Sequence, residues 1–201
     1  MKEERKSMLI VISGPSGAGK GTICKMLLDG DETMRFSVSA TTRGPREGEV
    51  EGVHYFFLTE EEYDRLLEED AFLEHATVHG HRYGTLKSQV QRMMDQGFSV
   101  VLDIDPQGAR EVMRQRPDCV SIFILPPSYK DLRQRLHTRN TDDPAEIEKR
   151  LNNARGEIEQ VHMYQYAVVN VNGDPTVAYD KVKTIIAAEQ QRTTRYFPVV
   201  E

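Results

Sequence analysis

The chain has 201 residues, a length typical of one domain, and its formal net charge at pH 7 is −6. Hydrophobic residues make up 38% of the sequence and charged residues 29%, which is ordinary for a globular protein with a sizeable core. Proteins that coat nucleic acid usually carry a basic surplus. The charge balance therefore argues against that function, although a local cluster of cations can still bind single nucleotides.

The N-terminal segment and the two cysteines predict a cytoplasmic protein without a membrane anchor. The apolar run 8–12 is too short for the core of a signal sequence or for a membrane span. Cys24 and Cys119 are too few for a disulfide framework, so we expect two buried thiols, with a single disulfide as the alternative.

Apolar runs of strand length alternate with helical patterns, which predicts βαβ units and a parallel sheet flanked by helices. Two stretches interrupt the alternation: short strand-like pieces with an acidic helix between residues 36 and 90, and an arginine-rich segment between 133 and 150. The acidic run of that helix is predicted to be a solvated face. Strands are expected at 8–13, 99–105, 120–125 and 167–172, and helices at 19–28, from Pro106 onward, and at 60–70, 131–139, 143–161 and 174–190.

The strongest local signal is a glycine-rich segment that follows the first predicted strand and opens a predicted helix. Its G-x-x-x-x-G-K pattern is typical of a phosphate-binding loop, in which backbone N–H groups surround one phosphate and the lysine reaches the β and γ phosphates. The alternative is a glycine-rich turn with a chance lysine. The predicted ATP-binding residues of this segment are Gly14, Pro15, Ser16, Gly17, Ala18, Gly19, Lys20, Gly21 and Thr22.

The loop departs from the usual pattern directly after its lysine. The residue that usually holds Mg²⁺ there is a serine or threonine, but this chain has Gly21, with a hydroxyl one place later at Thr22. The G-K-G-T form is common among nucleoside-monophosphate kinases. Direct ligation by Thr22 therefore stays open, and an ion held through water molecules is the alternative.

Two carboxylates, Asp103 and Asp105, end an apolar strand at the sheet edge where α/β proteins bind ligands. Strand alternation predicts that both lie on one face. We expect Asp103 to bind Mg²⁺ through water, and the alternative is that these acids cap the helix that begins at Pro106.

A second basic cluster precedes a short predicted strand. Arginine forks match pairs of phosphate oxygens, and serine and tyrosine hydroxyls can satisfy the remaining acceptors, so the cluster suits a monophosphate. The alternative is a charged surface loop. The residues concerned are Ser39, Arg43, Arg46, Glu49 and Tyr55.

Taken in order, the motifs S-x-x-T-R-x-P-R-x-G-E, G-V-H-Y-F, F-L-E-H-A, R-Y-G-T, L-D-I-D-P-Q-G and P-P-S resemble the guanylate kinase family over about residues 8–190. The resemblance implies one domain with a P-loop NTPase core (1–36, 91–132 and 151–201), a GMP-binding lobe (37–90) and a small lid (133–150). It also implies reversible, Mg²⁺-dependent transfer of the ATP γ-phosphoryl group to GMP and dGMP.

The resemblance also assigns the acceptor site. It implies that Glu74 and Thr85 bind the guanine base with help from Asp105. Guanine offers N1–H and N2–H₂ as adjacent donors to a carboxylate, and its O6 can accept from a hydroxyl; adenine lacks this pattern and would leave polar groups unpaired. The residues implied to bind the GMP phosphate are Ser39, Arg43, Arg46, Tyr55 and Tyr83, with Glu49 orienting the arginines.

On the donor side, Arg135, Arg139 and Arg150 match the arginines of the guanylate kinase lid, which together with Lys20 would neutralise charge on the transferring phosphoryl group. From spacing alone, the alternative is a solvated basic helix face. The resemblance further implies that Asn170 lies near the adenine.

Three other interpretations compete with this one. His75, His79 and His81 have even spacing on a predicted strand, but no fourth ligand lies nearby in the sequence, so we expect no metal site there. A different nucleoside-monophosphate or ribose-phosphate kinase would share the phosphate loop. A catalytically inactive, peptide-binding relative would typically have lost it. Oligomeric state is not predicted by any of these patterns.

Overall fold

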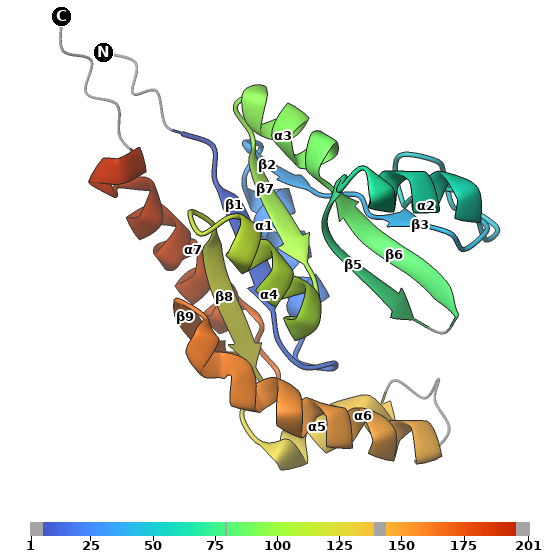
Figure 1. The fold of residues 1–201 in the computed structure, drawn as a ribbon. Helices are drawn as coiled ribbons and strands as arrows, with labels where there is room; N and C mark the ends of the chain where they lie inside the picture. The colour runs from blue at the N-terminus through green and yellow to red at the C-terminus, as the bar shows by residue number, and fades with distance from the viewer. Residues whose placement is uncertain (1–5, 79, 139–143, 196–201) are drawn as a thin grey trace, which may run out of the picture.

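The computed structural model describes residues 6–78, 80–138 and 144–195, and it shows an α/β protein built on two sheets (Figure 1). The larger sheet has five parallel strands in the order β2-β7-β1-β8-β9. The predicted parallel sheet is therefore confirmed. Its strands are β1 (Leu9–Ser13), β2 (Met34–Phe36), β7 (Ser99–Asp103), β8 (Val120–Leu125) and β9 (Tyr166–Val169).

The central strand β1 is apolar throughout because both faces of the sheet are covered by helices. Ile10 and Ile12 belong to one buried cluster and Leu9 and Val11 to the other, as the alternation of side chains along a strand requires. Burial of each such side chain contributes about 1.5–3 kcal/mol. The first cluster includes residues of α1 (Lys20–Gly30) and α7 (Thr176–Gln190), and the second includes residues of α3 (Lys87–Asp95) and α4 (Pro106–Gln115).

Both cysteines are buried in these clusters as free thiols, as expected. Burial raises the pKa of both, and that of Cys119 reaches about 11, so neither thiol is chemically activated. Within the described ranges, no helix is both long enough and apolar enough to cross a bilayer.

The segment between β2 and α3 forms a separate four-stranded sheet in the order β4-β3-β6-β5, which lies to the right of the core in Figure 1. Its small apolar core centres on Tyr63, whose ring stacks on Phe72 at 4.6 Å between centroids. The elements are β3 (Ala40–Thr41), β4 (Phe56–Phe57), α2 (Glu60–Glu68), β5 (Phe72–Val78) and β6 (His81–Leu86). We call residues 37–86 the lobe.

The acidic run on α2 is exposed, as predicted, but it is more than a solvated face. Glu62 completes a capping box with Thr59 at the start of the helix. Glu60 and Asp64 both form ion pairs with Arg82 of β6, and the Arg82 guanidinium also lies over the Tyr63 ring. The run therefore attaches the helix to its sheet.

Helices α5 (Tyr129–Thr138) and α6 (Pro144–Ile158) lie side by side across the end of the core sheet to which the strand arrows point (Figure 1). They pack on each other through Leu132 and Leu136 from α5 and Ile147 and Leu151 from α6. The helix predicted at 143–161 ends earlier, because the chain continues as a 3-10 turn, η1 (Glu159–Met163).

Two strands are shorter in the structure than the sequence predicted. The strand predicted to run to residue 105 ends at Asp103, because Asp105 is the N-cap of α4 and leaves the sheet. The strand predicted at 167–172 is β9, which ends at Val169, before a turn that leads to α7. β9 is an edge strand of the core sheet.

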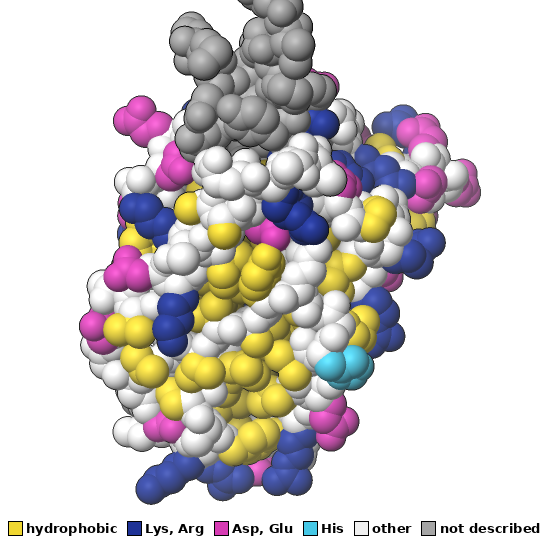
Figure 2. Space-filling view, turned by 90° about the vertical axis from the view of Figure 1, so that its left-hand side faces the viewer, with side chains coloured by type: hydrophobic (Ala, Val, Ile, Leu, Met, Phe, Trp, Pro, Cys, Tyr) yellow, Lys and Arg dark blue, Asp and Glu magenta, His cyan; other side chains and the backbone are white. Residues whose placement is uncertain are grey.

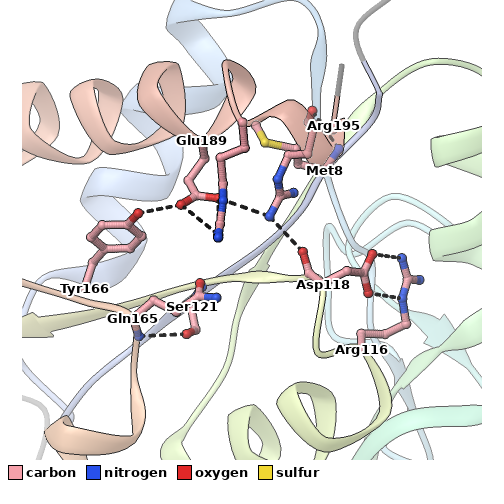
Figure 3. Close-up of polar contacts among 10 residues, drawn as sticks. Met8, Arg116, Asp118, Ser121, Gln165, Tyr166, Glu189 and Arg195 are labelled. Carbon is pink, nitrogen blue, oxygen red and sulfur yellow. Dashed lines mark hydrogen bonds and ion pairs between the residues drawn. The ribbon is translucent and has the colours of Figure 1, made fainter. Parts of the chain in front are cut away.

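At the opposite end of the sheet, the strands start beside a buried carboxylate, Glu189 of α7 (Figure 3). Glu189 is only 3% exposed, and it accepts a hydrogen bond of 2.5 Å from the Tyr166 hydroxyl. Arg195 and Arg192 pair with the same carboxylate at 3.1 and 3.4 Å, and Arg195 also donates to the carbonyl oxygen of Asp118. This cluster ties the last helix to β8 and β9.

The face that carries α7 and β9 is rich in hydrophobic side chains (Figure 2). Val169 of β9 and Val171, which follows it, are each more than a third exposed. Part of this apolar surface thus lies along β9, the last strand of the core sheet among the described residues.

Candidate active site

The predicted phosphate loop connects β1 to α1, and its glycines are required by the backbone. Gly14 has φ +141° and Gly19 has φ +94°, both in the region that favours glycine. A Cβ at Gly14 would lie 2.2 Å from the carbonyl oxygen of Ile124, and one at Gly19 would lie 2.3 Å from Nδ2 of Asn170. The loop is therefore pressed against β8 and the segment that follows β9, so glycine is required at both positions.

Lys20 begins α1 and folds back over the loop. Its ammonium donates to the carbonyl oxygens of Gly14, at 2.7 Å, and Pro15, at 3.3 Å. These neutral acceptors hold the cation at the helix N-terminus, where the backbone N–H groups also favour an anion. The arrangement suits a ligand that carries phosphate.

The unusual Gly21 lies beside Asp103. A Cβ at this position would be 3.5 Å from Oδ2 of Asp103, so the glycine leaves the first turn of α1 uncrowded next to the carboxylate. Burial raises the pKa of Asp103, and the nearby Lys20 ammonium opposes that shift. Thr22 is exposed and lines a cavity near Asn170.

The possible metal ligands around Asp103 suit a magnesium ion that keeps most of its water molecules. Among the described residues, no three acidic, histidine or cysteine side chains converge on one point. Mg²⁺ is commonly held by one or two carboxylates together with substrate phosphates and water. The single carboxylate of Asp103 beside the predicted phosphate loop fits this kind of coordination.

Asp105 differs from Asp103 in its role. Its Oδ1 accepts from the Gly108 N–H at 2.8 Å and caps α4, as the helix-capping alternative predicted. Because β7 ends at Asp103, the expected strand alternation does not extend to Asp105. The two acids are therefore not equivalent.

Two of the three predicted lid arginines contact the phosphate loop. Arg135 of α5 donates to the carbonyl oxygens of Ala18, at 3.2 Å, and Asn170, at 2.7 Å, and burial lowers its pKa. Arg150 of α6 donates to the Ser16 hydroxyl at 2.5 Å. The solvated-face alternative is wrong for these two, and Arg139 lies outside the described residues.

A cavity of about 550 Å³ opens beside the loop, between α5 and the segment that follows β9. Asn170 is buried in its wall and donates from Nδ2 to the Ala18 carbonyl oxygen at 2.8 Å. The cavity is lined by Gly17, Gly19, Thr22, Asp131, Gln134, Arg135, Asn170, Val171, Asn172, Gly173 and Pro175.

In the lobe, a carboxylate organises the predicted phosphate clamp. Glu49 pairs with the Arg43 guanidinium at 2.8 Å and accepts from the backbone N–H of Arg46, also at 2.8 Å. These two bonds lower the pKa of Glu49 to about 2, so the group is anionic throughout the physiological range. Glu49 thus orients the Arg43 side chain, whereas it contacts only the backbone of Arg46.

Two tyrosines flank this ion pair. The rings of Tyr55 and Tyr83 lie 6.0 Å apart in an edge-on arrangement, and the Arg43 guanidinium is 5.2 Å from the Tyr55 centroid. The bond with Glu49 raises the pKa of Arg43, and the nearby Tyr83 adds to this shift. Ser39 is held at the start of β3, where its carbonyl oxygen accepts from Phe56.

Glu74 and Thr85, predicted to act together, do form a buried pair. The Thr85 hydroxyl donates to Oε1 of Glu74 at 2.5 Å, and the two side chains are on the neighbouring strands β5 and β6. Burial raises the pKa of Glu74 to about 7; the Thr85 bond opposes this shift, and Asp105 and Glu111 reinforce it. The Glu74 carboxylate also approaches the core, because a Cβ at Gly108 of α4 would lie 2.8 Å from its Oε2.

Comparisons with known proteins agree with this geometry. The family model described as "Guanylate kinase" matches residues 6–189. The chain is 51% identical to a guanylate kinase of Clostridium perfringens, over 96% of this chain and 88% of the relative. It is 50% identical to one of Caldanaerobacter subterraneus, over 97% and 94%. The chain belongs to the guanylate kinase family.

A solved structure supports the same assignment. The crystal structure of guanylate kinase from Anaplasma phagocytophilum superposes with a TM-score of 0.75 at 35% identity, over 98% of this chain and 93% of that one. The P-loop NTPase type of fold expected from the sequence is therefore confirmed. The rival assignment to a different kinase family is wrong.

Within the guanylate kinase fold, some site residues gave no clear signal in the sequence. Asn172 accepts from Nε and Nη2 of Arg135, at 3.0 and 2.8 Å, across 37 residues of sequence. Glu157 of α6 is half-buried, and burial raises its pKa while the Lys20 ammonium of the phosphate loop opposes that shift. Both arrangements depend on how α5 and α6 pack on the core. His75 and His81 belong to no metal cluster in the described part of the chain, and His79 is not described.

Proposed function

We propose that the protein catalyses the reversible, Mg²⁺-dependent transfer of the γ-phosphoryl group of ATP to GMP, giving ADP and GDP, with dGMP as a second acceptor. The observation that carries the proposal is the buried Glu74–Thr85 pair, which extends from the lobe to α4 at the ligand-binding edge of the core sheet. A buried hydrogen-bonding pair thus faces the start of α4, and Asp103, at the end of the strand that precedes α4, lies beside the loop residue Gly21.

On the donor side, the loop amides bind the ATP phosphates, and Lys20 exchanges the carbonyl oxygens of Gly14 and Pro15 for phosphate oxygens. Asn170 and the adjacent cavity accept the adenosine part. Arg135, Arg139 and Arg150 neutralise the charge on the transferring group. Bound Mg²⁺ would supply further neutralisation of phosphate charge, and Asp103, with Thr22 as the weaker candidate, would hold it through water.

On the acceptor side, the monophosphate of GMP fits the clamp, which consists of Ser39, Arg43, Arg46, Tyr55 and Tyr83 with Glu49 as the orienting anion. Guanine N1–H and N2–H₂ donate to Glu74 in its ionised form. The Thr85 hydroxyl then turns from Glu74 to guanine O6, and the free Oδ2 of Asp105 assists at the exocyclic amine.

Phosphoryl transfer requires mainly positioning and the exclusion of water, so the lobe and the lid helices should approach each other when both substrates bind. We therefore expect small-angle scattering to show a smaller radius of gyration with ATP analogue and GMP together than without ligand. An unchanged radius would contradict closure of the lobe and of helices α5 and α6 over the core.

The test is a coupled assay of ADP release from ATP and Mg²⁺ with each common nucleoside monophosphate. GMP should be the preferred acceptor, followed by dGMP. AMP should be poorer by on the order of 10⁴-fold in kcat/KM, because it leaves the Glu74–Thr85 pair without its partners. Equal turnover of GMP and AMP would refute the base assignment.

We also propose that the reaction takes place in the cytoplasm, because both cysteines of the protein are buried as free thiols.

A further inference from the structure

One side-chain amide connects the lid helices to the core beside the phosphate loop. Asn172 lies in the turn between β9 and α7, and this turn is attached to β8 where the Asn170 N–H donates to the Leu125 carbonyl oxygen at 2.8 Å. Oδ1 of Asn172 accepts from Nε of Arg135 at 3.0 Å and from Nη2 at 2.8 Å. Because Arg135 belongs to α5, a side chain of the core holds a side chain of the lid.

The amide of Asn172 is oriented by a second contact with α5. Its Nδ2 donates to Oδ1 of Asp131, in the first turn of that helix, and Oδ2 of the same carboxylate accepts from the Ser128 hydroxyl. Only the oxygen of an amide can accept from a guanidinium, and only its nitrogen can donate to a carboxylate. Asp131 therefore determines that the oxygen of Asn172 faces Arg135.

Asn172 makes a large part of the contacts that fix the Arg135 guanidinium. A guanidinium has five N–H donors, and four hydrogen bonds are formed here: two to Asn172 and one each to the carbonyl oxygens of Asn170 and Ala18. Among the described residues, Asn172 is the only side chain that bonds to this guanidinium. A substitution at Asn172 would thus leave only the two backbone acceptors.

The guanidinium is held where the donor substrate is proposed to bind. Arg135 and Asn172 both line the cavity that is proposed to accept the adenosine part of ATP. The Ala18 carbonyl oxygen, which accepts from Arg135, belongs to the loop that is proposed to bind the ATP phosphates. A long arginine side chain has many rotamers, so contacts that select one of them reduce the entropy lost when phosphate binds.

We propose that Asn172 is a positioning residue for phosphoryl transfer: it holds the Arg135 guanidinium beside the phosphate loop, on the donor side of the site. The inference rests on the proposed function. Loss of the Asn172 acceptor should weaken the use of ATP, since Arg135 then adopts other rotamers. The use of GMP should change little, because its proposed clamp and base pair lie in the lobe.

The test compares three substitutions of Asn172 in steady-state assays with ATP, Mg²⁺ and GMP. We expect Asn172→Ala to lower kcat/KM for ATP on the order of 10-fold, with the KM for GMP changed less than about 2-fold. Asn172→Leu, which keeps a similar size without an acceptor, should be impaired to the same extent. Asn172→Asp keeps acceptor oxygens for Nε and Nη2 of Arg135 and should stay within about 3-fold of the unsubstituted enzyme.

Asn152→Ala is the matched control, because Asn152 is exposed on α6 and the same atoms are removed. It should leave kcat/KM for ATP unchanged. An Asn172→Ala enzyme as active as Asn152→Ala, or one with a higher kcat, would overturn the proposal. So would an aspartate variant as impaired as the alanine one, or a rise in the KM for GMP equal to that for ATP.

A double-mutant cycle with Arg135→Ala separates positioning of the arginine from a direct contact between Asn172 and ATP. If Asn172 acts through Arg135, the double variant should lose little more activity than Arg135→Ala alone. Full additivity of the two losses would contradict the proposal, because Asn172 would then act independently of the arginine.

Circular dichroism and thermal melting show whether each variant is folded. Asn172 is exposed, so we expect all three variants to fold, and the leucine and aspartate variants keep the test valid if Asn172→Ala does not. The unsubstituted protein is assayed in parallel. Its failure to form GDP would contradict the proposed function itself, whereas normal turnover of this protein together with unaffected Asn172 variants would contradict only the positioning role.

Discussion

The carboxylates at the two ends of the core sheet have different surroundings: the buried Glu189 at one end has cationic partners, whereas Asp103 and Glu157 at the other end are only partly buried. At the end where the strands begin, Glu189 is bonded to Tyr166 and paired with Arg192 and Arg195. At the end where they finish, Asp103 and Glu157 have no ion-pair partner within the described residues, and Lys20 acts on them only at longer range.

At the end where the strands finish, burial raises the pKa of Asp103, Glu157 and Glu74, the last to about 7. Paired charges at one end stabilise the fold. Charges at the other end are buried at a cost in stability, and such groups cluster at sites that bind ligands.

The largest effect that would test this contrast is the loss of the loop cation. We expect Lys20→Met to lower kcat on the order of 10³-fold with the fold intact, because the variant removes one charge aimed at the transition state. GDP formation and a melting curve are the measurements. Lys25→Met, at an exposed site on the same helix, is the control, and near-normal kcat in Lys20→Met would refute the role given to this lysine.

Next in size is the effect on base discrimination. Glu74→Gln and Thr85→Val should each lower kcat/KM for GMP on the order of 10²-fold, because guanine donors or O6 then lack a partner. The preference for GMP over AMP should narrow accordingly. Glu68→Gln, exposed at the end of α2, should leave both values unchanged. Unaltered discrimination in the Glu74 and Thr85 variants would show that the base is recognised elsewhere.

A third prediction compares the effects on stability of substituting the two buried glutamates, Glu189 and Glu74. Glu189→Gln should destabilise the protein by about 2–3 kcal/mol, because Arg195 and Arg192 lose their counter-charge. Glu74→Gln should instead stabilise it by about 1–3 kcal/mol at pH 8. Because the folded-state pKa of Glu74 is raised to about 7, its ionisation opposes folding above pH 7, and this penalty disappears below the unfolded-state value.

Chemical denaturation at pH 8 and pH 4.5 measures these changes, and the gain from Glu74→Gln should be absent at the lower pH. Glu189→Gln should keep normal kcat. Destabilisation of similar size by both substitutions at pH 8 would remove the proposed distinction between the two ends.

The smallest expected effect is on pH dependence. GMP binding needs ionised Glu74, whose pKa is about 7 in the free protein, so kcat/KM for GMP should be level at pH 8 and fall toward tenfold per unit below pH 7. Initial rates at low GMP between pH 5.5 and 8.5 test this. The fall near pH 7 should be absent in Glu74→Gln, and its persistence there would assign it to another group.

The sequence predicted the parts of this site that depend on local chemistry. The phosphate loop was predictable because Gly14, Gly19 and Lys20 have requirements set by backbone conformation within one turn. The Glu74–Thr85 pair followed from family resemblance, and its burial emerged only from the structure.

Other contacts could not be predicted, because they join distant segments through packing. Arg135 and Asn172 are 37 positions apart in the sequence, and they are hydrogen-bonded because α5 packs beside the segment that follows β9. Asp105 was assigned to the strand because the pattern of alternating apolar residues runs on to it, whereas a competing local signal, the start of a helix at Pro106, decides its position.

The most direct measurement follows the phosphoryl group itself. With ATP labelled in the γ-phosphate, Mg²⁺ and GMP, the label should move into the β-phosphate of GDP, and replacement of GMP by AMP should leave nearly all of it in ATP. Release of the label as inorganic phosphate, or equal transfer to AMP, would contradict the account of a phosphate loop facing a guanine-specific acceptor site.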